Sequence, residues 1–156
     1  MVVKKHSELD VDDLVRIVKL KQQAWPKYSI YEHLKWISEN LKPDDLHCWV
    51  EDFSAYCNMF NIEIELDGVK QNALGLGNLC SGNNMGAGAL LMKQVMNDPV
   101  YPLLSFCNYD MVSYYKHFGW EFIHRSRCEF TIDLTDLRVM YYGPQFNKIK
   151  YTGNKI

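Results

Sequence analysis

Apolar residues at helical spacing dominate the N-terminal part of the chain. Between residues 11 and 25 they recur every three or four positions, which predicts an amphipathic helix. Asp10 stands at the expected N-cap, and Pro26 is expected to end the helix. The predicted buried stripe of this helix consists of Val11, Leu14, Val15, Val18 and Trp25.

A second helix is predicted to begin at Ser29. Ser29 and Glu32 have the spacing of a capping box, in which each side chain accepts a hydrogen bond from the backbone of the other residue. Pro43 is expected to end this helix. Its predicted apolar stripe consists of Ile30, Leu34, Ile37 and Leu41.

The pattern then changes to that of strands. Residues 46–53, 55–66 and 69–80 predict three strands, and Asp67-Gly68 between the last two is a strong hairpin signal. A turn rich in glycine follows the third strand. Behind that turn, one face of a predicted helix carries Leu91, Met92, Val95 and Met96.

The last third of the chain predicts further strands around one helix. Residues 102–107 (PLLSFC) are continuously apolar, as in a strand that is buried on both faces. Residues 109–118 predict a helix that Gly119 closes as its C-terminal cap. Closing strands are expected at 120–125 and 128–134, with 138–143 as the alternative to the second.

Residues 2–9 (VVKKHSEL) could open the chain as a short strand, so the predicted order of elements is β-α-α-β-β-β-α-β-α-β-β. The central strand–helix–strand unit implies a parallel pair of strands with a right-handed crossover, and the hairpins imply antiparallel pairs. The fold class is therefore α/β, with a mixed α+β sheet that has helices on both faces. The length of 156 residues suits a single domain over residues 1–156.

Composition narrows the class of protein. Hydrophobic residues make up 47% of the chain and charged residues 23%, which is enough for a packed core. A net charge of −2 argues against a nucleic-acid partner. The five cysteines include no Cys-x-x-Cys pair, and no signal peptide or membrane span is seen. We therefore expect a cytoplasmic protein with reduced thiols, no metal and no membrane partner.

The glycine-rich turn is the main candidate for a binding site. Gly82, Gly86 and Gly88 lie where a strand gives way to a helix, although each glycine in a helical turn costs roughly 1 kcal/mol relative to alanine. The first turn of a helix has unpaired N–H groups that attract phosphate. The alternative is close packing of the helix on the sheet. The Walker, dinucleotide and nucleophile-elbow motifs do not match these residues.

The turn resembles the coenzyme-binding motif of the GNAT superfamily of N-acetyltransferases. In that family an aliphatic residue ends a strand, and Arg/Gln-x-x-Gly-x-Gly/Ala then opens a helix. Here Leu79 takes the aliphatic position and residues 83–88 (NNMGAG) take the loop. Asn83 replaces the usual Arg or Gln, so it brings no charge to a phosphate.

A second motif supports the resemblance. Residues 108–120 (NYDMVSYYKHFGW) are similar to the family element Asn-x-x-Ala-x-x-x-Tyr-x-x-x-Gly-Phe. Asn108, Tyr115 and Gly119 fall in register, while Met111 and Trp120 replace the usual Ala and Phe. The resemblance covers nearly the whole chain, although only residues 79–120 carry it at the level of motifs.

The resemblance implies a GNAT-like fold in which acetyl-CoA, as co-substrate, lies between two parallel strands that splay apart. Backbone N–H groups of residues 84–88 would bind the pyrophosphate. Leu79 and Asn108 would hold the pantetheine arm from its two sides. The implied coenzyme contacts are Leu79, Cys80, Ser81, Asn83, Asn84, Met85, Gly86, Ala87, Gly88, Asn108 and Tyr115.

The implied reaction is attack by a neutral amine on the thioester. Tyr115 is the predicted general acid for the departing thiolate, a role worth typically 10²–10⁴-fold in rate. The alternative for Tyr115 is a half-buried aromatic on the helix face, as expected for Tyr114.

The general base is harder to assign. Residues 72–80 contain no acidic residue, so Glu63 and Glu65 on the preceding strand are the best candidates, with a solvated strand face as the alternative. An amine that is already partly neutral needs no dedicated base. Cys80 could carry a covalent acyl group, but no histidine is placed by sequence to activate it, and a small core residue fits better.

Two other functions fit the sequence. Asn83 and the missing carboxylate favour a catalytically impaired module that binds coenzyme A or regulates a partner. An unrelated interaction domain would instead use Trp25, Trp36 and Trp49 as a surface. For an enzyme, the amine acceptor could be a small molecule or a protein, and both a monomer and a homodimer fit the sequence.

Overall fold

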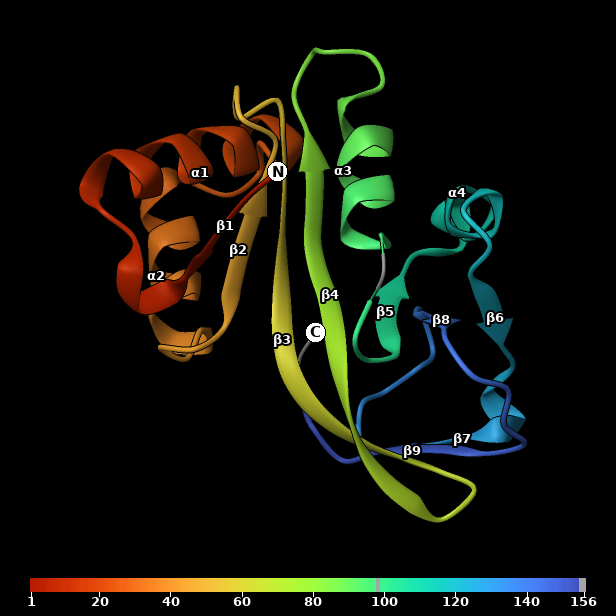
Figure 1. Cartoon of the computed structure of the whole chain (residues 1–156). Coiled ribbons are helices and arrows are strands. Elements are labelled where there is room, and N and C mark those ends of the chain that lie inside the picture. The colour runs from red at the N-terminus through yellow and green to blue at the C-terminus, as the bar shows by residue number, and fades with distance from the viewer. Residues whose placement is uncertain (98, 155–156) are drawn as a thin grey trace. The chain divides into compact units, whose positions relative to one another are not determined.

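The computed structural model describes residues 1–97 and 99–154, which form two compact units (Figure 1). The first unit contains residues 1–59 and 78–97, and the second contains residues 60–77 together with the described residues from 99 onward. Two long strands, β3 (Ala55–Leu66) and β4 (Val69–Ser81), contribute to both units. Within the described ranges, no helix is long and apolar enough to cross a membrane.

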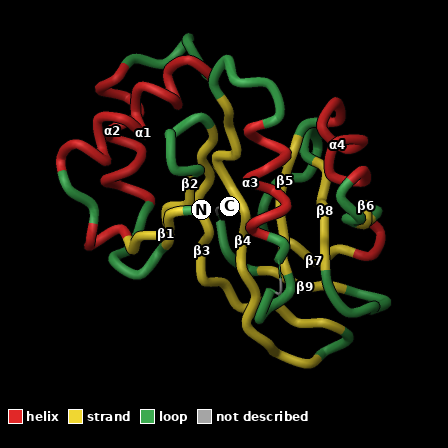
Figure 2. The backbone as a smooth tube through the Cα atoms, turned by 45° about the horizontal axis from the view of Figure 1, so that its top comes forward, coloured by secondary structure: helices red, strands yellow, loops and turns green. Residues whose placement is uncertain are grey.

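The first unit begins with β1 (Val2–Lys5), a short 3₁₀ turn (His6–Glu8) and two helices, α1 (Val11–Ala24) and α2 (Ile30–Asn40). Figures 1 and 2 show the two helices side by side. Both predicted N-caps are confirmed. Asp10 accepts a hydrogen bond from the Asp13 N–H, Ser29 accepts one from the Glu32 N–H, and each capping box is complete.

The predicted apolar stripes of these helices are partly wrong. Val11, Val15, Ile30 and Leu34 are exposed. The buried face of α1 carries Ile17, Val18 and Leu20, and it also carries Asp13 and Lys21, whose polarity concealed this face from a hydrophobic pattern. Asp13 is buried because Lys4 from β1 donates a hydrogen bond to its carboxylate. On α2, the predicted Ile37 and the following Leu41 are buried.

The strands of the first unit lie in the order β1-β2-β3-β4, where β2 spans Leu46–Trp49. Both β1–β2 and β2–β3 are antiparallel pairs. The chain leaves β4 and enters α3 (Ala87–Val95), whose buried face carries Leu91, Met92 and Val95 as predicted.

The second unit contains the parallel pair. Strand β5 (Leu103–Cys107) runs parallel to β4, and the order continues antiparallel through β8 (Arg138–Tyr142) to β6 (Glu121–Ile123). Strand β9 (Ile149–Tyr151) pairs antiparallel with β3 and parallel with β7 (Cys128–Phe130). The helices of this unit are α4 (Val112–His117) and the 3₁₀ turns at Tyr109–Met111 and Arg125–Arg127.

The mixed fold, the parallel pair and the Asp67-Gly68 hairpin are confirmed, but the closing strands need a correction. Strands occur at both predicted positions, as β6 and β7, and also at residues 138–142, where only an alternative was expected. Strand β8 is the antiparallel neighbour of β5, and β9 extends the predicted order further. The apolar core of this unit contains Ile64, Leu66, Ala73, Leu104, Ile123, Val139, Tyr141, Phe146, Ile149 and Tyr151.

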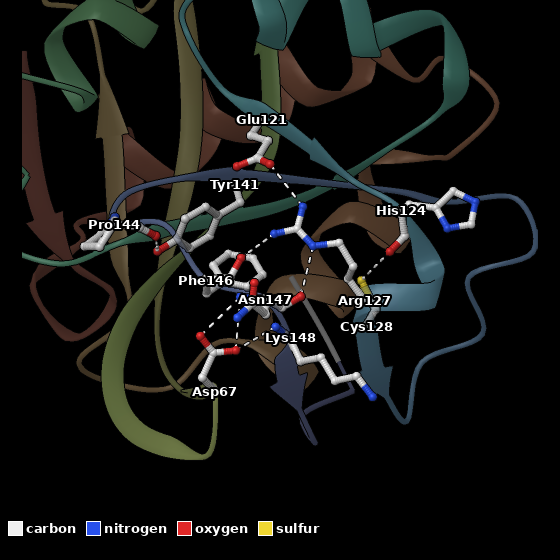
Figure 3. A network of polar contacts seen from close by, with 10 residues as sticks. All are labelled: Asp67, Glu121, His124, Arg127, Cys128, Tyr141, Pro144, Phe146, Asn147 and Lys148. Atoms are coloured by element: carbon white, nitrogen blue, oxygen red, sulfur yellow. Dashed lines mark hydrogen bonds and ion pairs between the residues drawn. The ribbon is translucent and has the colours of Figure 1, made fainter.

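Polar contacts tie the loop before β9 to two distant turns (Figure 3). Asp67, in the left-handed conformation at the hairpin turn (φ 50°), accepts hydrogen bonds from the N–H groups of Asn147 and Lys148. Arg127 donates to the carbonyl oxygens of Phe146 and Asn147, and its guanidinium lies 3.1 Å from a Glu121 carboxylate oxygen. These side chains satisfy backbone groups of a loop that has no ladder of its own.

Asp67→Ala is expected to lower the free energy of unfolding by about 2 kcal/mol, because charged hydrogen bonds to backbone N–H groups are lost. Urea denaturation measures the change. Asp136→Ala, at an exposed position of the same unit, is the control and should change stability by less than about 0.5 kcal/mol. Equal effects of the two substitutions would contradict the role assigned to Asp67.

Candidate functional site

The parallel ladder between β4 and β5 runs from Leu74–Leu103 to Leu76–Ser105, while β4 continues to Ser81 and β5 to Cys107. At its last pair, the Ser105 hydroxyl donates to the Leu76 carbonyl oxygen at 2.8 Å. The same Ser105 oxygen lies 3.0 Å from the Tyr115 hydroxyl. Because a serine hydroxyl has one proton, Tyr115 is the donor in this second bond. The result is a series of two hydrogen bonds, in which Tyr115 donates to Ser105 and Ser105 donates to the Leu76 carbonyl oxygen.

Tyr115 is held by α4 and the turn behind it. Its side chain is buried, and its ring meets the buried Trp120 ring edge-on at 5.1 Å. Gly119 adopts φ 85°, and the Trp120 N–H donates to the Tyr115 carbonyl, which confirms the predicted cap of this helix. Trp120 therefore fixes the Tyr115 ring where a smaller aromatic was typical of the motif.

Asn108 lies just beyond β5, at the start of the 3₁₀ turn that leads into α4. Its carbonyl oxygen accepts from the Met111 N–H at 3.0 Å, which fixes the backbone. Its exposed side chain makes no capping hydrogen bond to that turn. The amide is thus presented at the surface, as a group that contacts a ligand must be.

In the first unit, the β4–α3 turn ends in a helix without a side-chain cap. Gly86 is the N-cap of α3, with φ 87°, and no side chain accepts from the first turn, in contrast to the capping boxes of α1 and α2. A Cβ added to Gly86 would have no atom within 4 Å. The glycine is therefore explained by its left-handed backbone, and the space above it is open.

The rest of the turn is held by the β2–β3 loop. The Gly82 N–H donates to the Ser54 carbonyl at 2.9 Å, and the Asn84 side chain donates to Asp52 at 3.4 Å. A Cβ at Gly82 would lie 3.2 Å from the Gln23 side-chain oxygen. Close packing on α1 therefore explains Gly82, whereas a ligand is not needed to explain it.

Cationic side chains of α1 lie beside this turn. Arg16 and Lys19 line a hollow of about 380 Å³ together with Asn83, Asn84 and Asp52. The Arg16 guanidinium also lies 5.0 Å from the centre of the Phe53 ring. Positive charge is therefore present next to Asn83, the position where the motif usually carries it.

Cys80, at the end of β4, faces a buried lysine. Lys21 is only 2% exposed, and its ammonium lies 4.4 Å from the centre of the Trp36 ring. Burial lowers the pKa of Lys21 to about 8 and raises the pKa of the Cys80 thiol to about 12. Cys80 is thus a buried, protonated thiol, which supports a core residue over an acyl-cysteine.

Asn78 shapes β4 just before Leu79. It adopts φ 54°, and its side-chain Nδ2 donates to the side-chain Oδ1 of Asn58 at 3.0 Å. The Asn58 amide nitrogen in turn lies 3.3 Å from His47 Nδ1, which is also 2.7 Å from the Tyr56 hydroxyl. Because Nδ1 accepts here, the His47 proton is on Nε2, toward His6 at 3.1 Å. Burial lowers the pKa of His47 to about 3, so this network is neutral.

Glu63 and Glu65 lie on the hairpin half of β3. Glu63 pairs with Lys70 at 3.8 Å, and Glu65 lies opposite Lys150 in the β3–β9 ladder. Both glutamates line a shallow hollow of about 190 Å³ with these lysines and Thr152. Their role as a base remains a prediction. In the part of the chain that is described, no group of three His, Cys, Asp or Glu side chains is arranged to hold a metal ion.

The predicted coenzyme contacts therefore fall into two groups, residues 79–88 in the first unit and Asn108 with Tyr115 in the second. Sequence reasoning missed Ser105 and Asn78. Ser105 is the only polar residue in PLLSFC, and a buried hydroxyl needs a partner, so a signal was present. The side chain of Asn78, whose backbone is left-handed, bonds to Asn58, which is 20 residues away, and no local sequence pattern predicts this contact.

Solved structures with the same fold include N-acyltransferases. An acyl-CoA N-acyltransferase from Pseudomonas aeruginosa matches with a TM-score of 0.62 and 16% identity, over 91% of this chain and 97% of that one. A GNAT family N-acetyltransferase from Escherichia coli, solved with CoA, matches with a TM-score of 0.61 and 12% identity, over 97% and 89%. A Bacillus subtilis N-acetyltransferase solved with coenzyme A matches with a TM-score of 0.57 and 14% identity, over 94% of this chain and 99% of that one.

No protein-family model matches the sequence, and no curated protein matches it significantly. The structural matches establish that the chain has the GNAT acyltransferase fold, as the two motifs indicated.

Lys21→Met is expected to change how stability depends on pH. The pKa of Lys21 is about 8 in the fold, against an ordinary value of 10.5, so the folded chain loses this proton first and stability rises between these pH values. The variant lacks this rise. The stability of Lys21→Met relative to the parent should therefore fall by about 3 kcal/mol between pH 7 and pH 10.5.

Denaturant titrations at several pH values measure this difference. Lys19→Met, at an exposed position of the same helix, is the control and should leave the pH dependence unchanged. A constant difference between Lys21→Met and the parent across this range would show that Lys21 is not desolvated.

Proposed function

We propose that this protein transfers an acyl group from an acyl-coenzyme A, with acetyl-CoA as the expected donor, to a primary amine. The observation that carries the proposal is the hydrogen-bonded chain from Tyr115 through Ser105 to the Leu76 carbonyl, at the end of the parallel ladder. It places an oriented phenol proton beside the strands between which the thioester is expected. The GNAT acyltransferase fold, found in neighbours solved with coenzyme A, supports the same reading.

The pantetheine arm would bind along β4, beyond the last ladder pair at Leu76. Its amides would complete the strand edge near Leu79, and the exposed Asn108 side chain would hydrogen-bond to it. The pyrophosphate would take N–H groups from residues 84–88, where α3 has no side-chain cap. Arg16 and Lys19 would supply the positive charge that Asn83 lacks.

In the proposed reaction, the amine nitrogen attacks the thioester carbonyl carbon, so a C–N bond forms and the C–S bond breaks. The Tyr115 hydroxyl gives its proton to the departing thiolate sulfur. Ser105 holds that hydroxyl by accepting its hydrogen bond while donating to Leu76, and the Tyr115 O–H would turn from Ser105 to the sulfur as the thiolate departs. The amine loses its proton to water, or to Glu63 or Glu65 through water, and Tyr115 is then reprotonated.

A module that binds coenzyme A without turnover is the second candidate. The placement of Glu63 favours it, because its carboxylate lies 3.8 Å from the Lys70 ammonium and is already paired with a cation. A coenzyme-release assay over a panel of amines distinguishes the two. Acyl-amine product identifies the enzyme, whereas binding without product identifies the module.

Tyr115→Phe is expected to lower kcat at least tenfold, since a general acid contributes typically 10²–10⁴-fold. The affinity for coenzyme A should stay within about threefold, because the ring packing on Trp120 is retained. Steady-state kinetics and calorimetric binding give the two values. Tyr114→Phe, next to it on α4, is the matched control. An unchanged kcat in Tyr115→Phe would remove the proposed acid.

Gly86→Ala is expected to weaken coenzyme A binding at least tenfold, because a methyl group would stand over the first turn of α3. Gly68→Ala is a matched control, since both glycines have positive φ and neither has an atom within 4 Å of its Cβ position. Both variants should lose about 1 kcal/mol of stability from backbone strain. Equal affinities of the two variants for coenzyme A would place the pyrophosphate elsewhere.

A further inference from the structure

The β2–β3 loop contains a phenylalanine in an unfavourable backbone conformation. The Phe53 N–H donates to the Val50 carbonyl oxygen at 2.8 Å, and the Val50 N–H donates to the Ala55 carbonyl oxygen at 3.2 Å, so the loop is a closed turn. Phe53 itself adopts φ 57°, in the left-handed region that glycine ordinarily occupies. Such strain costs free energy and occurs mainly at functional sites, so the contacts of the Phe53 ring indicate a function.

The Phe53 ring contacts a buried tryptophan and an exposed arginine. It stacks on the Trp49 ring, with the ring centroids 4.7 Å apart and an interplanar angle of 22°. Trp49 is buried at the end of β2 and is therefore a fixed support. The Arg16 guanidinium from α1 lies 5.0 Å from the centre of the Phe53 ring, within the range of a cation–π interaction. Phe53 thus restricts a long, exposed side chain.

Arg16 lies at the hollow of about 380 Å³ that is formed by α1, the β2–β3 loop and the β4–α3 turn. Lys19 and Gln23 line the same hollow, three and seven residues after Arg16, which is the spacing of one helix face. In the described part of the chain, neither Arg16 nor Lys19 has a carboxylate within ion-pair distance. Both positive charges are therefore available to a ligand.

The carboxylate that lines the hollow, Asp52, is engaged by other groups. One of its oxygens accepts from the Ser54 N–H at 2.9 Å, and the other accepts from the Asn84 side-chain amide at 3.4 Å. The Ser54 carbonyl oxygen accepts from the Gly82 N–H at 2.9 Å. Asp52 and Ser54 therefore join the β2–β3 loop to the β4–α3 turn, and the loop that holds this turn is also the loop that holds Arg16.

A phosphate group fits this arrangement. A guanidinium that packs on an aromatic ring keeps its N–H edge for hydrogen bonds, and that edge can pair with two phosphate oxygens. Asn83 adds an amide donor to the hollow. In the proposed function the donor brings its pyrophosphate to residues 84–88, and Asn84 belongs both to that stretch and to the lining of the hollow.

We propose that this hollow binds a phosphate group of the acyl donor through Arg16, and that Phe53 is the positioning residue that holds Arg16 for it. The inference rests on the proposed acyl transfer, and it assigns to α1 and the β2–β3 loop the role that the motif arginine, replaced by Asn83, would have. Lys19 adds charge without a fixed direction. The strain at Phe53 is retained because glycine at this position would remove the ring that holds the guanidinium.

Arg16→Gln should weaken the binding of coenzyme A about tenfold in calorimetric titrations, because a charged hydrogen-bonded pair is lost. Arg125→Gln, which removes an exposed arginine of the second unit, is the matched control and should leave the affinity unchanged. Dephospho-coenzyme A, which lacks the 3′-phosphate, identifies the group that is bound. A loss for both ligands assigns the pyrophosphate to Arg16, and a loss for coenzyme A alone assigns the 3′-phosphate. An unchanged affinity of Arg16→Gln for coenzyme A would overturn the proposal.

Phe53→Leu keeps the Cβ atom and the backbone strain but removes the aromatic ring, and it should weaken coenzyme A binding about threefold. Phe53→Tyr keeps the ring and should bind as the parent does. Phe53→Leu introduced into Arg16→Gln should cause no further loss of affinity, because Phe53 acts through Arg16. A merely structural role would lower the stability of Phe53→Leu without changing its affinity, and that result, or an additive loss in the double variant, would overturn the positioning role.

Inorganic pyrophosphate, used as a second ligand, separates this inference from the function on which it rests. If coenzyme A does not bind to the parent, the proposed function fails, yet pyrophosphate binding that Arg16→Gln abolishes still supports the phosphate site. A parent that binds neither ligand overturns both proposals. Coenzyme A binding and acyl transfer that Arg16→Gln and Phe53→Leu leave unchanged overturn this inference and keep the proposed function intact.

Discussion

The hydrogen bond from the Ser105 hydroxyl to the Leu76 carbonyl is the contact on which the proposed site depends. A parallel ladder that stops inside two strands leaves backbone groups to be satisfied, and a buried carbonyl without a partner is costly. Ser105 supplies that partner from its side chain and, at the same time, fixes the direction in which Tyr115 donates. One residue thus ends the strand pairing and orients the acid.

The three longer helices differ in how their N-termini are capped. Asp10 and Ser29 close α1 and α2 with side chains, so those helix ends serve stability. Gly86 opens α3 with no side-chain cap, and the turn before it is held instead by Ser54 and Asp52. The β2–β3 loop therefore holds this turn, and no side chain caps the first turn of α3.

Local signals were sufficient for the caps and the Asp67-Gly68 hairpin, because each depends on residues near in sequence. The parallel pair followed from the strand–helix–strand order of the predicted elements. They failed where burial depends on distant partners. The buried face of α1 was missed because it includes two charged residues. Asp13 is paired with Lys4 from β1, and the Lys21 ammonium lies over the Trp36 ring. Strand β8 was undervalued because its pairing with β5 is long-range. At the candidate site, the motif residues come from the sequence and their roles stay predictions. The identity of Tyr115 as the partner of Ser105 depends on the folded arrangement of β5 and α4.

The hydrogen bonds that Asp67 accepts from the N–H groups of Asn147 and Lys148 join positions that are 80 and 81 residues apart. Contacts of such separation close late, since the entropy of a large loop must be overcome first. On the ribosome, the β3–β4 hairpin emerges long before the segment that locks its tip. Its edge therefore waits unpaired through much of synthesis, and the acidic Glu63 and Glu65 along it are the kind of charge that discourages association with other nascent chains.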